Sequence, residues 1–257
     1  YITPHVEGLT VGRFLQILLD AMSQLFFSLS VSMGIMITYG SYVKKDVNLN
    51  KAVNQIEFFD TGVALLAGAM IIPAVFVFSG TEGMGAGPSL MFVSLPKVFA
   101  AMGTAGIVVG ALFFISAIFA TLTSCISVLE SITANCMEIF HTSRKKTVLI
   151  LSVIYLAASA VIALGYSIFY FEVQLPNGST AQLLDIMDYI SNSVMMPLIA
   201  LLSTILIGWV KTPEYVIGEM ELGGYSFRRK RVYIVMIRYI APIMMLILFL
   251  QSTGILG

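Results

Sequence analysis

The chain has 257 residues, of which 58% are hydrophobic and only 11% are charged, and its formal net charge is zero. Soluble globular proteins carry about 25% charged residues and rarely contain repeated apolar runs of about 20 residues. The composition therefore predicts a polytopic membrane protein and excludes a soluble domain, and the balanced charge gives no sign of a nucleic-acid partner.

Six apolar segments qualify as membrane spans. They cover approximately residues 14–42, 53–79, 104–139, 147–170, 181–210 and 232–253. A spanning helix needs about 20 residues, so the longer segments predict tilt or extension into water. Residues 82–102 contain prolines and glycines around a short apolar run, and we expect them to form a helical loop on the outer face.

The first span is interrupted in its middle by small residues. Within QLFFSLSVSMGIMITYGSY, from Gln24 to Tyr42, these residues are Ser28, Ser30, Ser32 and Gly34. Hydrocarbon offers no hydrogen bonds, so small polar residues at mid-depth predict backbone that opens onto a cavity. Unwound helices at mid-membrane bind ions and small solutes, which makes this segment the first candidate site.

Asp60 lies near the start of the second expected span and is followed by an apolar stretch with no other acid. A carboxylate inside a membrane is costly and is a functional candidate by default. Hydropathy alone places Asp60 near the cytoplasmic edge, where an acid means little, whereas a helix that begins near Asn50 places it well inside. The sequence leaves both interpretations open.

The third span has one small and polar face on an otherwise apolar helix. Its members recur at helical spacing and are Ala120, Thr123, Ser124, Ser127, Glu130, Ser131, Ala134 and Glu138. Close helix packing, with hydroxyls bonded to their own backbone, is one explanation. Two acids on the same stripe favour a water-accessible path, in which Thr123 and Ser124 offer oxygen ligands to a hard cation such as sodium.

Other candidate groups support little chemistry. Asp185 and Asp188 open the fifth span, where an acid stabilises a helix N-terminus and a second acid is a candidate gate charge.

The cysteines and histidines offer no bond or metal site. Cys125 and Cys136 are eleven positions apart on one helix, which separates them by about 16 Å and excludes a disulfide between them. His5 and His141 lie in loops without partners for a metal. No nucleophile triad or phosphate loop appears, so an enzyme is not expected.

Basic residues predict the orientation, because Lys and Arg are retained in short cytoplasmic loops. The loops after the first, third and fifth spans hold eleven of the 14 basic residues. Both ends of the chain are therefore expected outside. The opening YITPHVEGLTVG has no initiator Met and no export signal, so we expect the C-terminal part of a longer protein with an odd number of spans upstream.

QLFFSLSVSMGIMITYGSY in the first span and FATLTSC in the third resemble the neurotransmitter:sodium symporter family. GPSLMFVSLPKVFAAMG, IMDYIS and RYIAP extend the resemblance over the whole chain. It implies an all-α polytopic fold in which the chain supplies helices six to eleven. These would be the second inverted repeat of a five-plus-five transporter plus one helix, with the N-terminal five helices absent.

The resemblance also implies roles for individual residues. The substrate site would include Phe27, Ser28, Ser30, Met33, Ser124 and Val128. One sodium site would use Ser28 and Asp60, and the other Ala120, Thr123 and Ser124. Asp188 would belong to the outer gate, and Tyr42 and Glu138 to the inner gate.

Asp60 stands where many members of that family have Asn, and Ala64 follows one turn later. Asp60 would then supply the negative charge that chloride supplies elsewhere, with Gln24 and Ser28 as neighbours, so we expect chloride-independent transport. No charged side chain projects from the expected pocket wall, which favours a small neutral amino acid, apolar or aromatic.

The leading hypothesis is therefore sodium-coupled symport of such an amino acid by alternating access in the cell membrane. The expected partners are the substrate, Na⁺, the bilayer and the missing half of the transporter. A proton-driven carrier of the same fold, with Asp60 titrating, and a non-transporting sensor or binding protein that keeps the fold are the alternatives.

Overall fold

The computed structural model describes residues 9–80, 90–176 and 178–255, so His5 and residues 82–89 of the expected outer loop lie outside the described residues. The chain divides into two compact units. The first is built from Ala52–Ile126 and the second from Thr10–Lys51 and Ser127–Gly257. Each unit is described by itself.

The predicted all-helical membrane fold is confirmed. Within the described residues, five stretches are long and apolar enough to cross a membrane: Leu49–Phe78, Thr104–Phe140, Arg144–Leu164, Leu183–Val210 and Lys230–Ser252. The segment expected as the first span has instead the form of two shorter helices, α1 (Val11–Ser28) and α2 (Ile35–Tyr42).

The first unit contains most of α3 (Leu49–Ser79), the π-helix η2 (Leu90–Ser94), α4 (Leu95–Ala101) and the first part of α5 (Thr104–Phe140). Its core is formed by Val75, Leu95 and Val98, against which Phe99 and Phe113 pack. Two glycines one turn apart let α4 approach α5 closely. A Cβ at Gly106 would meet the carbonyl oxygen of Phe99 at 1.7 Å, and one at Gly110 would meet its ring at 3.1 Å. Small residues at this spacing commonly allow such approach between membrane helices.

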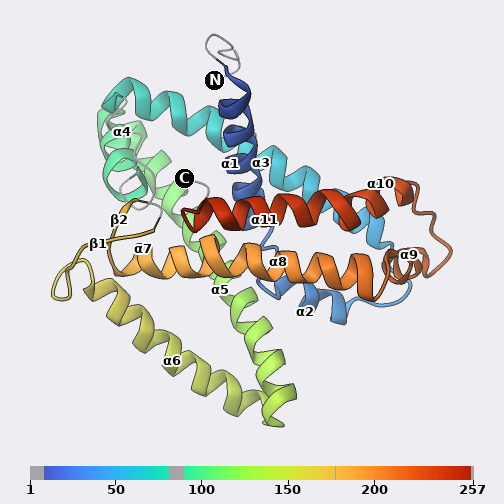
Figure 1. Cartoon of the computed structure of the whole chain (residues 1–257). Coiled ribbons are helices and arrows are strands. Elements are labelled where there is room, and N and C mark those ends of the chain that lie inside the picture. Colours follow the sequence, from blue (N-terminus) through green and yellow to red (C-terminus); the bar gives the residue numbers. More distant parts are fainter. Residues whose placement is uncertain (1–8, 81–89, 177, 256–257) are drawn as a thin grey trace. The chain divides into compact units, whose positions relative to one another are not determined.

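The second unit holds the broken helix and the rest of the chain (Figure 1). After α5 come α6 (Arg144–Leu164), the antiparallel hairpin of β1 (Val173–Gln174) and β2 (Thr180–Ala181), and α7 (Leu183–Asp188). The expected fifth span continues through the π-helix η3 (Tyr189–Met195), α8 (Met196–Ile205) and the π-helix η4 (Leu206–Val210). The last elements are α9 (Pro213–Glu221), α10 (Lys230–Val235), the π-helix η5 (Met236–Ile240) and α11 (Ala241–Ser252).

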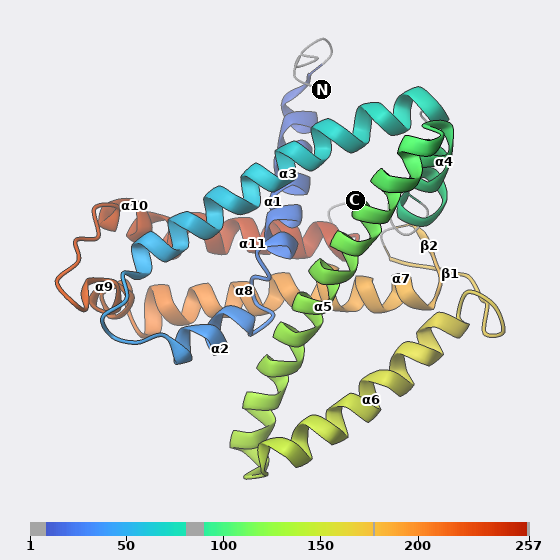
Figure 2. The same ribbon diagram turned by 180° about the vertical axis from the view of Figure 1, so that it is seen from behind.

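The core of the second unit lies between α8 and α11, which run side by side in both views (Figures 1 and 2). Ala200, Met245 and Leu248 are buried there. Apolar residues of α1, among them Leu19 and Phe26, pack against this core. The first half of the broken helix, α1, is therefore anchored on the α8–α11 pair.

Candidate functional site

The break in the first expected span is a stretch of irregular backbone between α1 and α2. Three of its residues have left-handed φ angles, Ser30 at 52°, Ser32 at 67° and Gly34 at 79°. Such angles are uncommon for residues other than glycine and cost energy, and they concentrate at functional sites. The structure thus places three of the small residues of the sequence pattern in backbone that no regular helix uses.

The C-terminus of α1 and the N-terminus of α2 lie on either side of the break. α1 ends in a widened turn, in which the amide of Val31 donates to the carbonyl of Phe26 at 2.9 Å. Carbonyls at the end of α1 carry partial negative charge and amides at the start of α2 carry partial positive charge. An arrangement of this kind binds a cation at one end and a carboxylate at the other.

The predicted substrate residues of this segment surround the break. Phe27 and Ser28 are the last two residues of α1 and are exposed, whereas Ser30 and Met33 lie within the irregular turn and are half-buried. Ser30 has a left-handed φ angle, and Phe27 and Ser28 end α1, so regular helical hydrogen bonding stops among these residues.

Gly34 allows the break to touch α5. A Cβ at Gly34 would lie 2.9 Å from Oγ of Ser131, which is buried, and the positive φ of Gly34 disfavours any side chain there. Thr38, one turn later, donates from Oγ1 to the carbonyl of Gly34 at 3.1 Å and to Oγ of Ser131 at 3.3 Å. The turn and the polar stripe of α5 are thus joined at a buried point.

A row of side-chain hydrogen bonds continues this contact along α2. We call the set of Thr38, Tyr39 and Tyr42 with their α5 partners the α2–α5 latch. Oη of Tyr39 lies 2.5 Å from Oγ of Ser127, and Oη of Tyr42 donates to Oε1 of Glu130 at 2.7 Å. Every member lies on one face of its helix, so the second half of the broken helix, α2, is held by polar contacts.

Arg144, the first residue of α6, completes the latch. It donates from Nη1 and Nη2 to the two oxygens of Glu130, at 3.0 and 2.5 Å. Its side chain is 59% exposed while that of Glu130 is 17% exposed, so the pair joins a half-buried acid to a solvated base. A bidentate arginine fixes the carboxylate that receives Tyr42.

The family resemblance implies an inner-gate role for both Tyr42 and Glu138. In the structure Tyr42 bonds to Glu130, two turns earlier on α5, and Glu138 is exposed. The sequence marks Glu130 only as a member of the polar stripe of the third span, and it gives Arg144 no role in a site. The signal that finds them is the helical register, because positions 127, 130 and 131 share one face.

The remaining cation-site candidates lie in the first unit. Asp60 is half-buried in the interior of α3, eleven residues after its start, in agreement with a helix that begins near Asn50. Thr123 and Ser124 both donate to the carbonyl of Ala120, at 2.8 and 3.1 Å. These three residues form a small group of oxygens on one exposed turn of α5. Val128 lies one turn later and is assigned to the second unit.

At the other end of the second unit, the two acids of the fifth expected span differ in their contacts. Asp185 caps α7 by accepting from the amide of Gln182 at 3.0 Å, the ordinary role of an acid at a helix N-terminus. Asp188 is exposed and accepts from Nδ2 of Asn192 at 2.6 Å. Asp185 therefore has a capping role, and the gate role of Asp188 stays a prediction.

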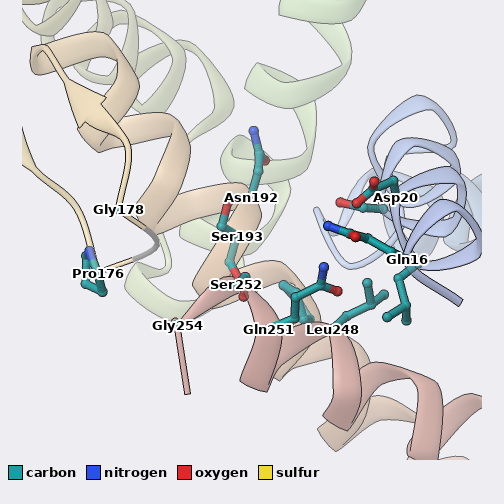
Figure 3. Close-up of a pocket in the computed structure, with 13 residues that line it drawn as sticks. Gln16, Asp20, Pro176, Gly178, Asn192, Ser193, Leu248, Gln251, Ser252 and Gly254 are labelled. Carbon is teal, nitrogen blue, oxygen red and sulfur yellow. The ribbon is translucent and has the colours of Figure 1, made fainter. Parts of the chain in front are cut away.

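A cavity of about 630 Å³ opens beside this end, between α1, η3, α11 and the hairpin loop (Figure 3). Asp20 and Gln16 of α1 face Asn192, Ser193, Gln251 and Ser252 across it. The described residues that line it include one carboxylate and no basic side chain, a lining that favours cations over anions. Gln24, expected near Asp60, is exposed one turn after Asp20.

The comparisons with known proteins bear directly on this arrangement. A profile of the Sodium:neurotransmitter symporter family matches residues 1–255. The chain belongs to that family. The resemblance seen in the sequence is thereby confirmed, and the family is one of transporters rather than enzymes.

Similar proteins carry consistent names. One is the uncharacterized sodium-dependent transporter YhdH of Bacillus subtilis, which is 32% identical to this chain. The match covers 100% of this chain and 54% of YhdH. An uncharacterized sodium-dependent transporter of Haemophilus influenzae is also 32% identical, over 98% of this chain and 52% of its own length. The crystal structure of MhsT in complex with L-phenylalanine is 36% identical with a TM-score of 0.80, over 91% of this chain and 51% of MhsT. The chain thus spans about half the length of the relatives it matches.

Among the described residues, no group of three or more His, Cys, Asp or Glu side chains is arranged to hold a metal ion. Sodium is a hard cation that takes backbone carbonyl and hydroxyl oxygens together with single carboxylates. The oxygens at the break, at Ala120 to Ser124 and at Asp60 are of that kind.

Proposed function

We propose that the protein to which this chain contributes is a sodium-coupled symporter of a small neutral amino acid, apolar or aromatic, working by alternating access. The observation that carries the proposal is the broken helix between α1 and α2, with left-handed backbone at Ser30, Ser32 and Gly34, in a chain that belongs to a sodium symporter family. Strained backbone at mid-span has no value for a merely structural membrane helix.

Sodium would be held at two places. Ser28 at the end of α1 and Asp60 of α3 are proposed for one, and the oxygens of Ala120, Thr123 and Ser124 for the other. In the present structure the hydroxyls of Thr123 and Ser124 donate to the Ala120 carbonyl. To bind a cation, the two hydroxyls would turn their lone pairs toward it and release that carbonyl, a side-chain rotation that needs no backbone movement.

The substrate would bind at the break. Phe27, Ser28, Ser30 and Met33 supply an apolar and hydroxyl-bearing wall without charge, and Ser124 and Val128 are proposed as its continuation. The amino group would meet the carbonyls where α1 ends. The L-phenylalanine bound to MhsT supports an amino acid with an apolar side chain.

The α2–α5 latch is proposed as the inner barrier. Tyr42, Glu130 and Arg144 meet at polar side chains, and polar contacts can be exchanged for water at little net cost when a path opens. Sodium and substrate would favour the latched state, because a ligand shifts an equilibrium only by its different affinity for the two states. Release of substrate inward would follow when α2 separates from α5.

Chloride is not required in this proposal, since Asp60 carries the negative charge and Ala64 offers no ligand one turn later. Purified complete protein in liposomes, with an inward sodium gradient, should take up labelled neutral amino acids equally in chloride and in gluconate. A fall of severalfold in gluconate would contradict chloride independence alone and would leave sodium coupling standing.

The driving ion is tested in the same vesicles. Uptake under a sodium gradient and none under a proton gradient alone is expected. Uptake driven by protons would instead identify Asp60 as a titrating group, and substrate binding without uptake under either gradient would identify a sensor. Asp60→Ala should raise the sodium requirement steeply, whereas Glu57→Ala, which changes an exposed acid one turn earlier on α3, is the control that should leave it unchanged.

A further inference from the structure

α8 and α11 share an unusual design. The two helices run side by side in the second unit (Figures 1 and 2), and each follows a π-helical segment and carries a proline at its second residue, Pro197 in α8 and Pro242 in α11. Proline has no amide hydrogen, so it cannot donate to the carbonyl four residues before it. That carbonyl belongs to Ser193 in one helix and to Arg238 in the other.

Each of these two carbonyls accepts a hydrogen bond from a side chain of the partner helix. Oγ of Ser252, at the end of α11, donates to the carbonyl of Ser193, and the same hydroxyl lies 3.0 Å from the carbonyl of Phe249. Nε1 of Trp209, in η4, donates to the carbonyl of Arg238 at 3.1 Å. The carbonyl that each proline deprives of its i+4 donor thus accepts a hydrogen bond from the other helix.

Return bonds run in the opposite direction at both ends. Oη of Tyr189 donates to the carbonyl of Ser252 at 2.9 Å, and Nε of Arg238 donates to the carbonyl of Gly208 at 3.0 Å. Glycine is needed at position 208, because a Cβ there would lie 2.9 Å from the carbonyl of Ile237. Each end therefore has a reciprocal pair of side-chain-to-backbone bonds, which we name the outer clasp (Tyr189, Ser193, Ser252) and the inner clasp (Gly208, Trp209, Arg238).

We infer that Pro197 and Pro242 each expose a carbonyl so that the partner helix can bind it, and that the two clasps make α8 and α11 a single rigid body. Buried or membrane-embedded carbonyls must be satisfied, so a carbonyl without a helical donor fixes the partner helix in register. Apolar packing of Met245 and Leu248 between the clasps has no such directional preference.

The outer clasp also shapes the cavity beside Asp20. Ser193 and Ser252 both line that cavity, and their side chains lie together at its α8–α11 wall in Figure 3. Ser252 is therefore a positioning residue, which fixes the wall against which α1 packs without itself needing to touch a substrate.

The test is a double-mutant cycle that asks whether the proline and the donor act through one carbonyl. Ser252→Ala should speed amide exchange in residues 189–200 of the complete protein in nanodiscs by about fivefold, the effect of one lost hydrogen bond. Pro197→Ala supplies the missing amide hydrogen, so in that background Ser252→Ala should have almost no further effect. Ser191→Ala is the matched control, because Ser191 donates only to carbonyls of its own helix, those of Met187 and Asp188.

The inner clasp gives an independent cycle in case Pro197→Ala disturbs folding. Trp209→Phe removes the indole donor and keeps an aromatic ring against Tyr239, and Pro242→Ala supplies the amide that would replace it. Trp209→Phe should speed exchange in η5, on the helix that was not changed, and Pro242→Ala should abolish that effect. Tyr239→Phe is the control. Equal effects of the donor deletions in both backgrounds, or faster exchange on the mutated helix alone, would overturn the inference, and neither result depends on transport.

Discussion

The α2–α5 latch and the α8–α11 pair join helices in opposite ways. The latch uses side chains on both partners, as in Tyr42 with Glu130 and Thr38 with Ser131, around only two buried residues of α2, Ile35 and Thr38. The α8–α11 pair has buried apolar packing, closed at each end by bonds from side chains to backbone carbonyls. Side-chain partners can be replaced by water, whereas a carbonyl without its helical donor cannot turn away. The comparison predicts a mobile contact at α2 and a fixed one at α11.

Met245→Ala should have the largest effect on stability. Met245 is 1% exposed between α8 and α11, and truncation of a buried methionine costs about 3 kcal/mol through lost contacts and a residual cavity. The free energy of unfolding, measured by SDS titration in bicelles, should fall by that amount. Met236→Ala, at an exposed position of η5, should change it little. Equal losses in the two variants would mean that the pair is not tightly packed.

Gly34→Ala should come next, at about 2 kcal/mol. The added Cβ would occupy left-handed backbone and would press against Oγ of Ser131. Gly40→Ala is the control on the same helix, since nothing lies within 4 Å of its Cβ position. Gly34→Ala should also lower sodium-driven uptake in vesicles. Normal uptake and stability would show that the break does not need this contact.

Glu130→Gln should release the latch without unfolding the protein. The variant loses a charge-assisted acceptor for Tyr42 and the pair with Arg144, whose exposure means that salt already screens part of the attraction. Amide exchange in α2 should rise by about tenfold, while exchange in α11 stays unchanged. Glu138→Gln, an exposed acid on the same helix, should leave α2 as it is. If Glu138→Gln loosened α2 and Glu130→Gln did not, the gate expected from the sequence would be the better description.

Thr38→Val tests a single bond of the latch. It keeps the shape of a buried side chain and removes the donor to Ser131 and Gly34, at a cost of about 1 kcal/mol. Exchange in α2 should rise about fivefold. Thr121→Val deletes a hydroxyl that donates only within α5, to Ala117, and serves as the reference. An effect of Thr38→Val no larger than that of Thr121→Val would remove Thr38 from the latch.

The smallest expected effect is the pH dependence of the stability of the loop after α9. The Lys230 ammonium, followed by the amide of Phe227, holds the pKa of Glu221 below its usual value of 4.5. A lowered carboxylate pKa stabilises the folded loop above pH 4.5, and that contribution is lost as the pH falls below this value. The rate of amide hydrogen exchange in residues 222–230, corrected for the intrinsic rate, should rise modestly as the pH is lowered from 5 to 3.5. Glu221→Gln should remove this pH dependence, and its persistence would assign it to another group.

Much of the architecture could be predicted because it depends on local sequence patterns. Apolar length gave the spanning segments after the first, and small residues marked the position at which the first one breaks. The family resemblance supplied the residues of the expected sites. Tyr42 shows the limit: its partner depends on which turn of α5 lies opposite, and Glu130 and Glu138 are equally acidic and lie on the same stripe.

The clasps show the same limit in a stronger form. The sequence places Pro197 and Pro242 inside expected spans, and proline chemistry alone implies two carbonyls that lack an i+4 amide donor. Only the packing of α8 against α11 decides that Ser252 and Trp209 donate hydrogen bonds to these carbonyls. Composition and the small residues of the break by themselves determined a membrane protein with one broken helix, because lipid solvation and backbone strain act on local sequence. Tertiary structure alone decided the partners of the polar groups, because a hydrogen bond depends on distances between residues far apart in the chain.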